Sequence, residues 1–152
     1  MKNMKAKDIM EANVITIHEN TSVKEAAQIL LDNKIGGAPV VDDDGDVVGM
    51  VTEDDLIMRD VKLNFPTYLH FLDGYIYLGS LKKFEEGLKK AVGAKVKEVM
   101  SENIICVNED DSVKDAATIL VDKKIGRVPV LKGKKLVGII TKADIMKTIV
   151  KS

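Results

Sequence analysis

The sequence contains an internal duplication, and this feature limits the possible folds more than any other. Residues 8–42 align with residues 98–132 at a constant offset of 90, and seventeen of the 35 aligned positions are identical, which chance does not produce. After one deletion the offset becomes 89, and the similarity continues to residues 55 and 144. An internal repeat determines the architecture before any single element is considered. Each copy alone would have a marginal core, so we expect the two copies to pack as one cooperative unit.

Each copy has the residue pattern of a β-α-β-β-α unit. The predicted strands of the first copy are residues 14–17, 38–41 and 47–51. Residues 42–46 form a polar turn between the last two strands. Ser22 can cap a helix with one apolar face, and Gly36-Gly37 is expected to end that helix. Thr52 is expected to open a second helix.

The second copy repeats this pattern over residues 104–150. We therefore expect an α/β fold of the α+β kind, in which two β-α-β-β-α repeats related by a pseudo-two-fold axis pack sheet to sheet. The expected domains are residues 1–60 for repeat 1, residues 61–93 for a helical insert, and residues 94–152 for repeat 2. A pseudo-two-fold axis creates two related clefts, so the sequence predicts two similar but unequal sites.

One motif occurs at the same place in both copies and has the chemistry of an anion site. Its pattern is Gly, two apolar residues, Thr, two variable residues and Asp, in residues 49–55 and 138–144. It describes a strand that runs into the start of a helix, where free N–H groups and the helix dipole favour an anion. The glycine would allow close approach, Thr offers a hydroxyl, and Asp can accept hydrogen bonds from ribose. The same Thr-x-x-Asp spacing is also that of a helix capping box, and both roles stay open.

These motifs together resemble a tandem pair of cystathionine-β-synthase (CBS) domains, also called a Bateman module. The resemblance rests on Ile-Gly-x-x-Pro-Val, a Val-Gly strand and the Gly-to-Asp motif, each present twice, and it covers residues 5–60 and 94–150. It implies that the clefts bind AMP, ADP, ATP or another adenosyl ligand, as a regulatory ligand and not as a catalytic cofactor. It also implies that the module regulates an attached or associated partner protein.

The resemblance further implies which residues form the two sites. Thr would contact phosphate, Asp would contact ribose, and apolar residues of both repeats would enclose adenine. One site would comprise Thr141, Asp144, Val14, Ile15, Ile35 and Gly36. The other would comprise Thr52, Asp55, Ile104, Ile105, Ile125 and Gly126.

The base would have to stack on aliphatic side chains, because the two repeats contain no aromatic residue. Burying a base face of about 100 Å² contributes roughly 2–3 kcal/mol. Contacts to ribose and phosphate must supply the rest of the binding free energy, so we expect micromolar affinity.

Arg127 is an informative difference between the copies, because its counterpart is Gly37. Related modules often have Arg at this position as a phosphate contact, and the planar guanidinium suits paired phosphate oxygens. The resemblance therefore implies that Arg127 belongs to the Thr52 site and makes it the more selective site for phosphorylated ligands. The alternative is an exposed arginine at the start of a strand.

The charge balance and the remaining reactive residues argue against several function classes. With 23 basic and 24 acidic residues, the chain lacks the positive charge of a nucleic-acid-binding protein. No segment reaches the roughly 18 apolar residues that cross a membrane, and a single cysteine, Cys106, fits a reducing cytoplasm. Without a set of nucleophile, base or metal ligands, we expect no enzyme and no metal site. The acidic turn at residues 42–46 aligns with a basic segment, which favours a hairpin connection over a calcium loop.

All six aromatic residues lie in the insert, between Phe65 and Phe84. Aromatic side chains anchor interfaces, so the insert is either a surface for a partner or for self-association, or a linker packed over its own module. The family resemblance favours a homodimer. The main alternative to ligand sensing is a scaffold or dimerisation module that binds no ligand and acts through its aromatic insert.

Overall fold

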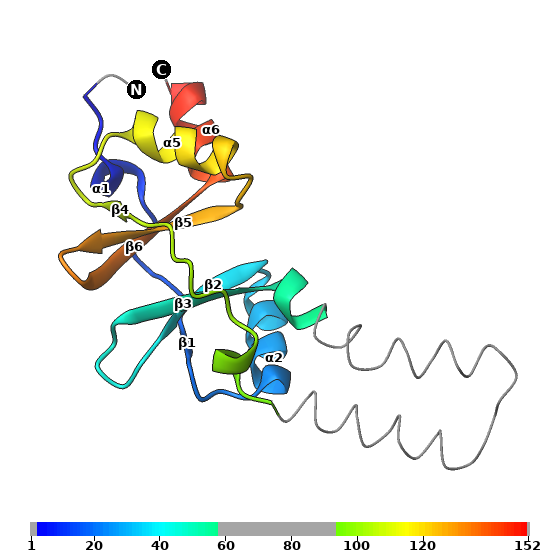
Figure 1. Ribbon diagram of the computed structural model, residues 1–152. Coiled ribbons are helices and arrows are strands. Elements are labelled where there is room, and N and C mark those ends of the chain that lie inside the picture. The colour runs from blue at the N-terminus through cyan, green and yellow to red at the C-terminus, as the bar shows by residue number, and fades with distance from the viewer. Residues whose placement is uncertain (1–2, 58–93, 152) are drawn as a thin grey trace, which may run out of the picture.

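The structure consists of two similar halves, each with one three-stranded sheet (Figure 1). The computed structural model describes residues 3–57 and 94–151. Its helices are α1 (Ala6–Ile9), α2 (Val23–Asn33), the 3-10 helix η1 (Val96–Glu98), α5 (Val113–Asp122) and α6 (Lys142–Lys151). Its strands are β1 (Ile17–His18), β2 (Gly37–Val41), β3 (Val47–Thr52), β4 (Val107–Asn108), β5 (Arg127–Lys132) and β6 (Lys135–Thr141). Residues 53–57 are also helical and follow β3 directly.

Both sheets have the same mixed topology, which confirms the expected α/β fold built from a repeated unit. β1 runs parallel to β2 and β2 runs antiparallel to β3, and β4, β5 and β6 repeat this order. The two sheets lie in the middle of the molecule, with α5 and α6 beyond one sheet and α2 beyond the other (Figure 1). The duplication in the sequence is therefore a duplication of the fold.

Serine caps and amphipathic helices build the two cores, as the sequence predicts. Ser22 Oγ accepts a hydrogen bond from the Glu25 N–H at 3.1 Å, and Ser112 does the same for the start of α5. The residues that α2 buries are Val23, Ala26 and Leu30, and those that α5 buries are Val113, Ala116 and Leu120. Each helix covers its own sheet, so each repeat has its own hydrophobic core.

Two element boundaries differ from the sequence-based prediction. The predicted strand at residues 14–17 is reduced to β1, because only Ile17 and His18 pair with β2. The glycines do not end α2, which stops earlier at Lys34. This residue adopts a left-handed conformation with φ of 54°, and its N–H reaches the carbonyls of the last helical turn.

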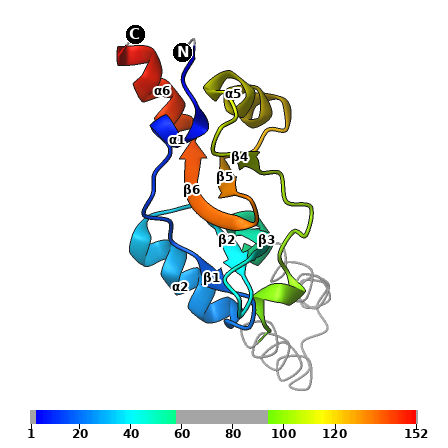
Figure 2. The same cartoon turned by 90° about the vertical axis from the view of Figure 1, so that its left-hand side faces the viewer.

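The first residues of each repeat pack on the other half of the molecule. Residues 3–11 pack on repeat 2, where Ala6 is fully buried and its N–H donates to the Asp111 carbonyl at 2.7 Å. Residues 94–100 pack on repeat 1, where Val96 is fully buried and donates to the Thr21 carbonyl at 2.8 Å. Figure 2 shows the N-terminal segment beside α6, while the segment with η1 lies by β1–β3. The packing units therefore cross the boundaries of the sequence repeats.

Gly49 and Gly138 leave room for these exchanged segments. A Cβ on Gly49 would lie 2.6 Å from Met100 Sδ and 2.8 Å from the Ser101 carbonyl oxygen. A Cβ on Gly138 would collide in the same way with the side chain of Met10. Both glycines are buried, so the motif needs glycine for packing and not for the close approach of a ligand.

The described residues contain no helix that is long and apolar enough to span a membrane. The predicted aromatic insert, with its proposed interface and helix, lies outside the described residues.

Replacing Gly49 with alanine should destabilise the fold, because the new methyl group meets backbone at Ser101 that cannot move independently. We expect Gly49→Ala to lower the free energy of unfolding by about 1–3 kcal/mol, measured by urea denaturation. Gly126→Ala is the matched control, because a Cβ at Gly126 has no heavy atom within 4 Å. Equal stability of the two variants would contradict the packing role of Gly49.

Candidate functional site

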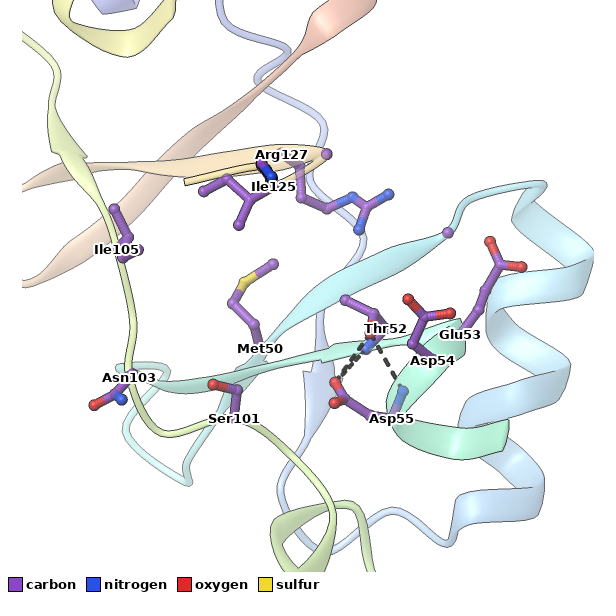
Figure 3. Close-up of a pocket in the computed structure, with 13 residues that line it drawn as sticks. Met50, Thr52, Glu53, Asp54, Asp55, Ser101, Asn103, Ile105, Ile125 and Arg127 are labelled. Carbon is purple, nitrogen blue, oxygen red and sulfur yellow. Dashed lines mark hydrogen bonds between the residues drawn. The ribbon is translucent and has the colours of Figure 1, made fainter. Parts of the chain in front are cut away.

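Two clefts lie between the repeats, and each contains one copy of the Thr/Asp pair. The Thr52 cleft has a volume of about 500 Å³ and also holds Asp55 (Figure 3). The Thr141 cleft has a volume of about 470 Å³ and also holds Asp144. Both volumes fall in the usual range for small-molecule sites. The two predicted clefts are thus present, and Gly36, Gly126 and Arg127 line both of them.

The Thr/Asp pair forms a helix cap in both repeats. Asp55 Oδ2 accepts from the Thr52 backbone N–H at 2.9 Å and from the Thr52 hydroxyl at 3.1 Å. Asp144 Oδ2 makes the same two contacts with Thr141, at 2.8 and 3.1 Å. The capping interpretation is therefore confirmed.

The cap leaves the second oxygen of each aspartate available. Oδ1 of Asp55 and Oδ1 of Asp144 accept no hydrogen bond from residues 3–57 or 94–151. Both aspartates are half-buried and line their clefts. A carboxylate oxygen that is held in place in this way is a strong acceptor for a ligand hydroxyl. Capping and ligand binding are therefore compatible in one side chain.

The structure brings nearly all the predicted site residues to the two clefts. The predicted residues that line the Thr141 cleft are Thr141, Asp144, Val14, Ile15, Ile35 and Gly36. Those that line the Thr52 cleft are Thr52, Asp55, Ile105, Ile125, Gly126 and Arg127. Ile104 is the exception, because it does not line the Thr52 cleft.

Several cleft residues were not predicted from the sequence. Met50 lines one cleft and Ile139 the other, and each stands two residues before the threonine of its cleft. Side chains alternate along a strand, so Met50 and Thr52 share the face opposite the buried Val51, and this alternation is visible in the sequence. Asn13 and Asn103 also line the clefts, and their identity in both repeats was a second available signal.

Arg127 lies between the clefts and not in one of them. In the sheet register it is opposite Thr141, while its side chain extends over the Gly36-Gly37 backbone of the other repeat. A Cβ on Gly36 would be 2.9 Å from its Nη2, and one on Gly37 would collide with Nη1. Repeat 1 has Gly37 where repeat 2 has Arg127. The glycine leaves room for the one guanidinium to occupy this central position.

The side chain of Arg127 is partly buried. Burial lowers the pKa of this guanidinium below its ordinary value, and Coulombic attraction to Glu53 opposes that shift. Arg127 lines the Thr52 cleft, as the sequence analysis expects, and it lines the Thr141 cleft as well, so its position alone does not distinguish the two clefts. The expected preference of the Thr52 cleft for phosphorylated ligands stays a prediction.

The acidic turn brings together the carboxylates of Asp42, Asp44 and Asp46, with oxygen atoms within 4.8 Å of one another. Asp42 Oδ1 already accepts from the backbone N–H groups of Asp44 and Asp46, at 3.0 and 2.9 Å. These hydrogen bonds explain the acidic residues as turn formers, as expected for a hairpin connection.

Comparisons with known proteins identify relatives of the whole arrangement. The family model described as the CBS domain matches residues 6–62 and 96–151. The uncharacterized protein MJ1404 of Methanocaldococcus jannaschii is 39% identical over 154 residues, which cover 98% of this chain and 32% of that protein. The uncharacterized protein MJ1426 of the same organism is 30% identical over 155 residues, which cover 97% of this chain and 92% of that protein. The chain thus spans about a third of the first relative and nearly all of the second.

Two similar solved structures contain adenosyl ligands. The crystal structure of CBSX2 of Arabidopsis thaliana in complex with AMP has a TM-score of 0.73 and 25% sequence identity, and the match covers 97% of this chain and 96% of that one. The CBS domain pair of protein MJ0100, in complex with 5′-methylthioadenosine and S-adenosyl-L-methionine, has a TM-score of 0.68 and 28% identity. That match covers 97% of both chains.

Cys106 should react slowly with thiol reagents in the native protein. Cys106 stands in the sequence between Ile105, which lines the Thr52 cleft, and the first residue of β4; its side chain is partly buried, and burial raises the pKa of the thiol above its ordinary value. Since the thiolate is the reactive form, we expect alkylation by iodoacetamide at pH 7.5 to be at least several-fold slower than in the urea-unfolded chain. The native rate should rise with pH above 9. Native and unfolded rates that agree at pH 7.5 would contradict this assignment.

Proposed function

The chain belongs to the CBS domain family as a tandem pair, and we propose that it is a regulatory module that binds adenosyl ligands in its two clefts. CBS-pair proteins are generally regulatory modules rather than enzymes. The observation that carries the proposal is the pairing, in each cleft, of a fixed aspartate oxygen with an aliphatic wall contributed by the opposite repeat. AMP, ADP, ATP and other adenosyl compounds have the matching parts, a ribose diol and a flat apolar base.

The ribose would bind to the free Oδ1 of Asp55 or Asp144. Two adjacent hydroxyls can donate to one carboxylate, and the cap holds that carboxylate still, so little entropy is lost on binding. The threonine hydroxyl lies beside the same carboxylate and can donate to a 5′ substituent of the ribose. Threonine would then exchange its weaker contact with aspartate for one with the ligand.

The base would lie against aliphatic side chains, most of which belong to the repeat opposite the aspartate. In the Thr141 cleft these are Val14, Ile15 and Ile35, and in the Thr52 cleft they are Ile105, Ile125 and Met50. Ile15 is 38% exposed, which is unusual for such a large apolar residue. Covering it with a base would remove that surface from water.

A ligand in either cleft would contact both repeats and would therefore favour one relative arrangement of them. A ligand shifts an equilibrium only by its difference in affinity between two states, and a site made of two bodies supplies that difference. We propose that this shift is the signal passed to a partner protein. The lone cysteine fits a reducing compartment such as the cytoplasm for this role.

Exchanging Asp144 for asparagine should reduce ligand binding with little loss of fold. Asparagine can keep an acceptor oxygen for the Thr141 N–H, but its amide then faces the ribose as a donor. We expect Asp144→Asn to weaken AMP binding at the Thr141 cleft at least tenfold in calorimetric titration. The melting temperature should change by only a few degrees.

Asp115→Asn is the matched control, because Asp115 is exposed on α5 and lines neither cleft. Unchanged AMP affinity in Asp144→Asn would contradict the proposed site. If the wild-type chain binds none of AMP, ADP, ATP or S-adenosylmethionine, the scaffold function becomes the better account.

Equivalent apolar pairs on the outer helices favour a homodimer. Leu31 on α2 is 72% exposed and Ile57 is 56% exposed, and both line one apolar groove of repeat 1. Their counterparts Val121 and Met146 are 70% and 59% exposed. Because each repeat presents such an exposed apolar pair, a second copy of the chain can cover both pairs through one two-fold interface.

Adding charge to both exposed apolar pairs should dissociate the dimer. We expect the wild-type chain to have twice the monomer mass by sedimentation equilibrium, and Leu31→Glu/Val121→Glu to have the monomer mass. Gln28→Glu/Thr118→Glu is the control, because it adds the same two charges on α2 and α5 at exposed positions outside the groove. A wild-type monomer, or a dimer that survives the double substitution, would contradict the proposed interface.

A further inference from the structure

The two clefts differ in charge at the residues between Thr and Asp. In repeat 1 these residues are Glu53 and Asp54, and both line the Thr52 cleft. In repeat 2 they are Lys142 and Ala143, and both line the Thr141 cleft. All four are exposed at the start of their helices, so neither core packing nor capping requires these residue types. The difference acts on whatever occupies the clefts.

The other charged residues increase this difference. Lys34 lines the Thr141 cleft and its counterpart Lys124 lines the Thr52 cleft, so each cleft has one of these equivalent lysines. Arg127 lines both clefts. Lys147 lines only the Thr141 cleft, and its counterpart in the sequence is the uncharged Met58. One acidic residue, Glu11, lines the Thr141 cleft where the other cleft has Ser101.

Counted over residues 3–57 and 94–151, the formal charges of the groups that line the two clefts therefore have opposite signs. The Thr52 cleft has three carboxylates (Glu53, Asp54, Asp55) against two cations, which leaves a formal charge of −1. The Thr141 cleft has four cations (Lys34, Arg127, Lys142, Lys147) against two carboxylates, which leaves a formal charge of +2. The capped aspartate is common to both clefts, so the difference in charge comes from the remaining groups.

The shared arginine does not remove the asymmetry. A Cβ on Gly36 would lie 2.7 Å from Glu53 Oε1 and 2.9 Å from Arg127 Nη2, so the carboxylate and the guanidinium both lie close to the Gly36 backbone. Figure 3 shows the carboxylates of Glu53 and Asp54 on the side of the Thr52 pocket that faces Arg127. In that cleft a phosphate would meet two carboxylates beside the guanidinium. In the Thr141 cleft it would meet Arg127 together with lysines.

We propose that the two clefts sort adenosyl ligands by charge. The Thr141 cleft takes a phosphorylated adenosyl ligand, whereas the Thr52 cleft takes one whose 5′ substituent is uncharged or cationic. This inference rests on the proposed adenosyl-binding function and assigns a ligand class to each cleft. The module would then compare two kinds of adenosyl compound and not two concentrations of one nucleotide, because the carboxylates of the Thr52 cleft disfavour a phosphate while the cations of the Thr141 cleft favour a phosphate over an uncharged or cationic group.

Exchanging the two variable residues between the repeats tests the charge sorting. The probes are AMP as the anionic ligand and 5′-methylthioadenosine as the uncharged one, titrated calorimetrically into the full chain. In the wild-type protein we expect AMP to fill one site tightly, and the AMP-saturated protein to bind 5′-methylthioadenosine at the other. AMP affinity should fall steeply with added salt, while 5′-methylthioadenosine affinity should not.

The swapped variants should move AMP selectivity in opposite directions. We expect Lys142→Glu/Ala143→Asp to weaken AMP binding at least tenfold and to leave 5′-methylthioadenosine binding within about twofold. We expect Glu53→Lys/Asp54→Ala to create a second AMP site of comparable affinity. Thermal melts should show that both variants fold, because the substituted positions are exposed.

The outcomes separate this inference from the proposed function. Wild-type binding of both probes with no change of AMP affinity in either swap would overturn the charge sorting and leave adenosyl binding intact. Equal loss of AMP and 5′-methylthioadenosine affinity in the Lys142 swap would also overturn it, because the effect would not depend on ligand charge. If neither AMP nor 5′-methylthioadenosine binds, the proposed function is overturned, and the inference with it.

Discussion

The reciprocal packing of each flanking segment on the opposite repeat is the constraint on which the rest of the structure depends. Residues 3–11 complete the core of repeat 2, and residues 94–100 complete that of repeat 1. Two backbone contacts at each crossing fix the position: Met50 and Ser101 exchange hydrogen bonds at 2.9 Å, and Glu11 and Ile139 do so at 2.8 and 3.0 Å. Neither half can then separate without exposing the core of the other, although each has its own sheet.

The clefts are a direct consequence of this exchange. After leaving the opposite repeat, each chain segment must cross back to its own sheet, and it passes the Thr/Asp helix start on the way. Residues 101–105 cross at the Thr52 cleft and residues 11–15 cross at the Thr141 cleft. Each site therefore contains a helix cap from one repeat and a crossing segment that leads to the other. A ligand at such a junction responds to the relation between the halves.

The sequence predicted the parts of this arrangement that local rules determine. Ser22 and Ser112 as caps, the Thr52/Asp55 and Thr141/Asp144 pairs, and most of the aliphatic cleft wall follow from spacing, repetition and family resemblance. The errors arise where tertiary contacts decide. Gly49 and Gly138 face a methionine from a distant segment, and the side chain of Arg127 reaches the opposite repeat, so neither role is visible in the local pattern. The sequence also contained the Glu53/Lys142 contrast, but its meaning depends on knowing that both residues line clefts.

A crystal structure of the full chain grown with AMP tests the two-cleft proposal most directly. The predicted result is electron density for AMP in the Thr141 cleft, with the ribose hydroxyls on Asp144 Oδ1, the base between Val14 and Ile35, and the phosphate beside Lys142 and Arg127. AMP bound outside both clefts, or clefts that stay empty at saturating AMP, would contradict it.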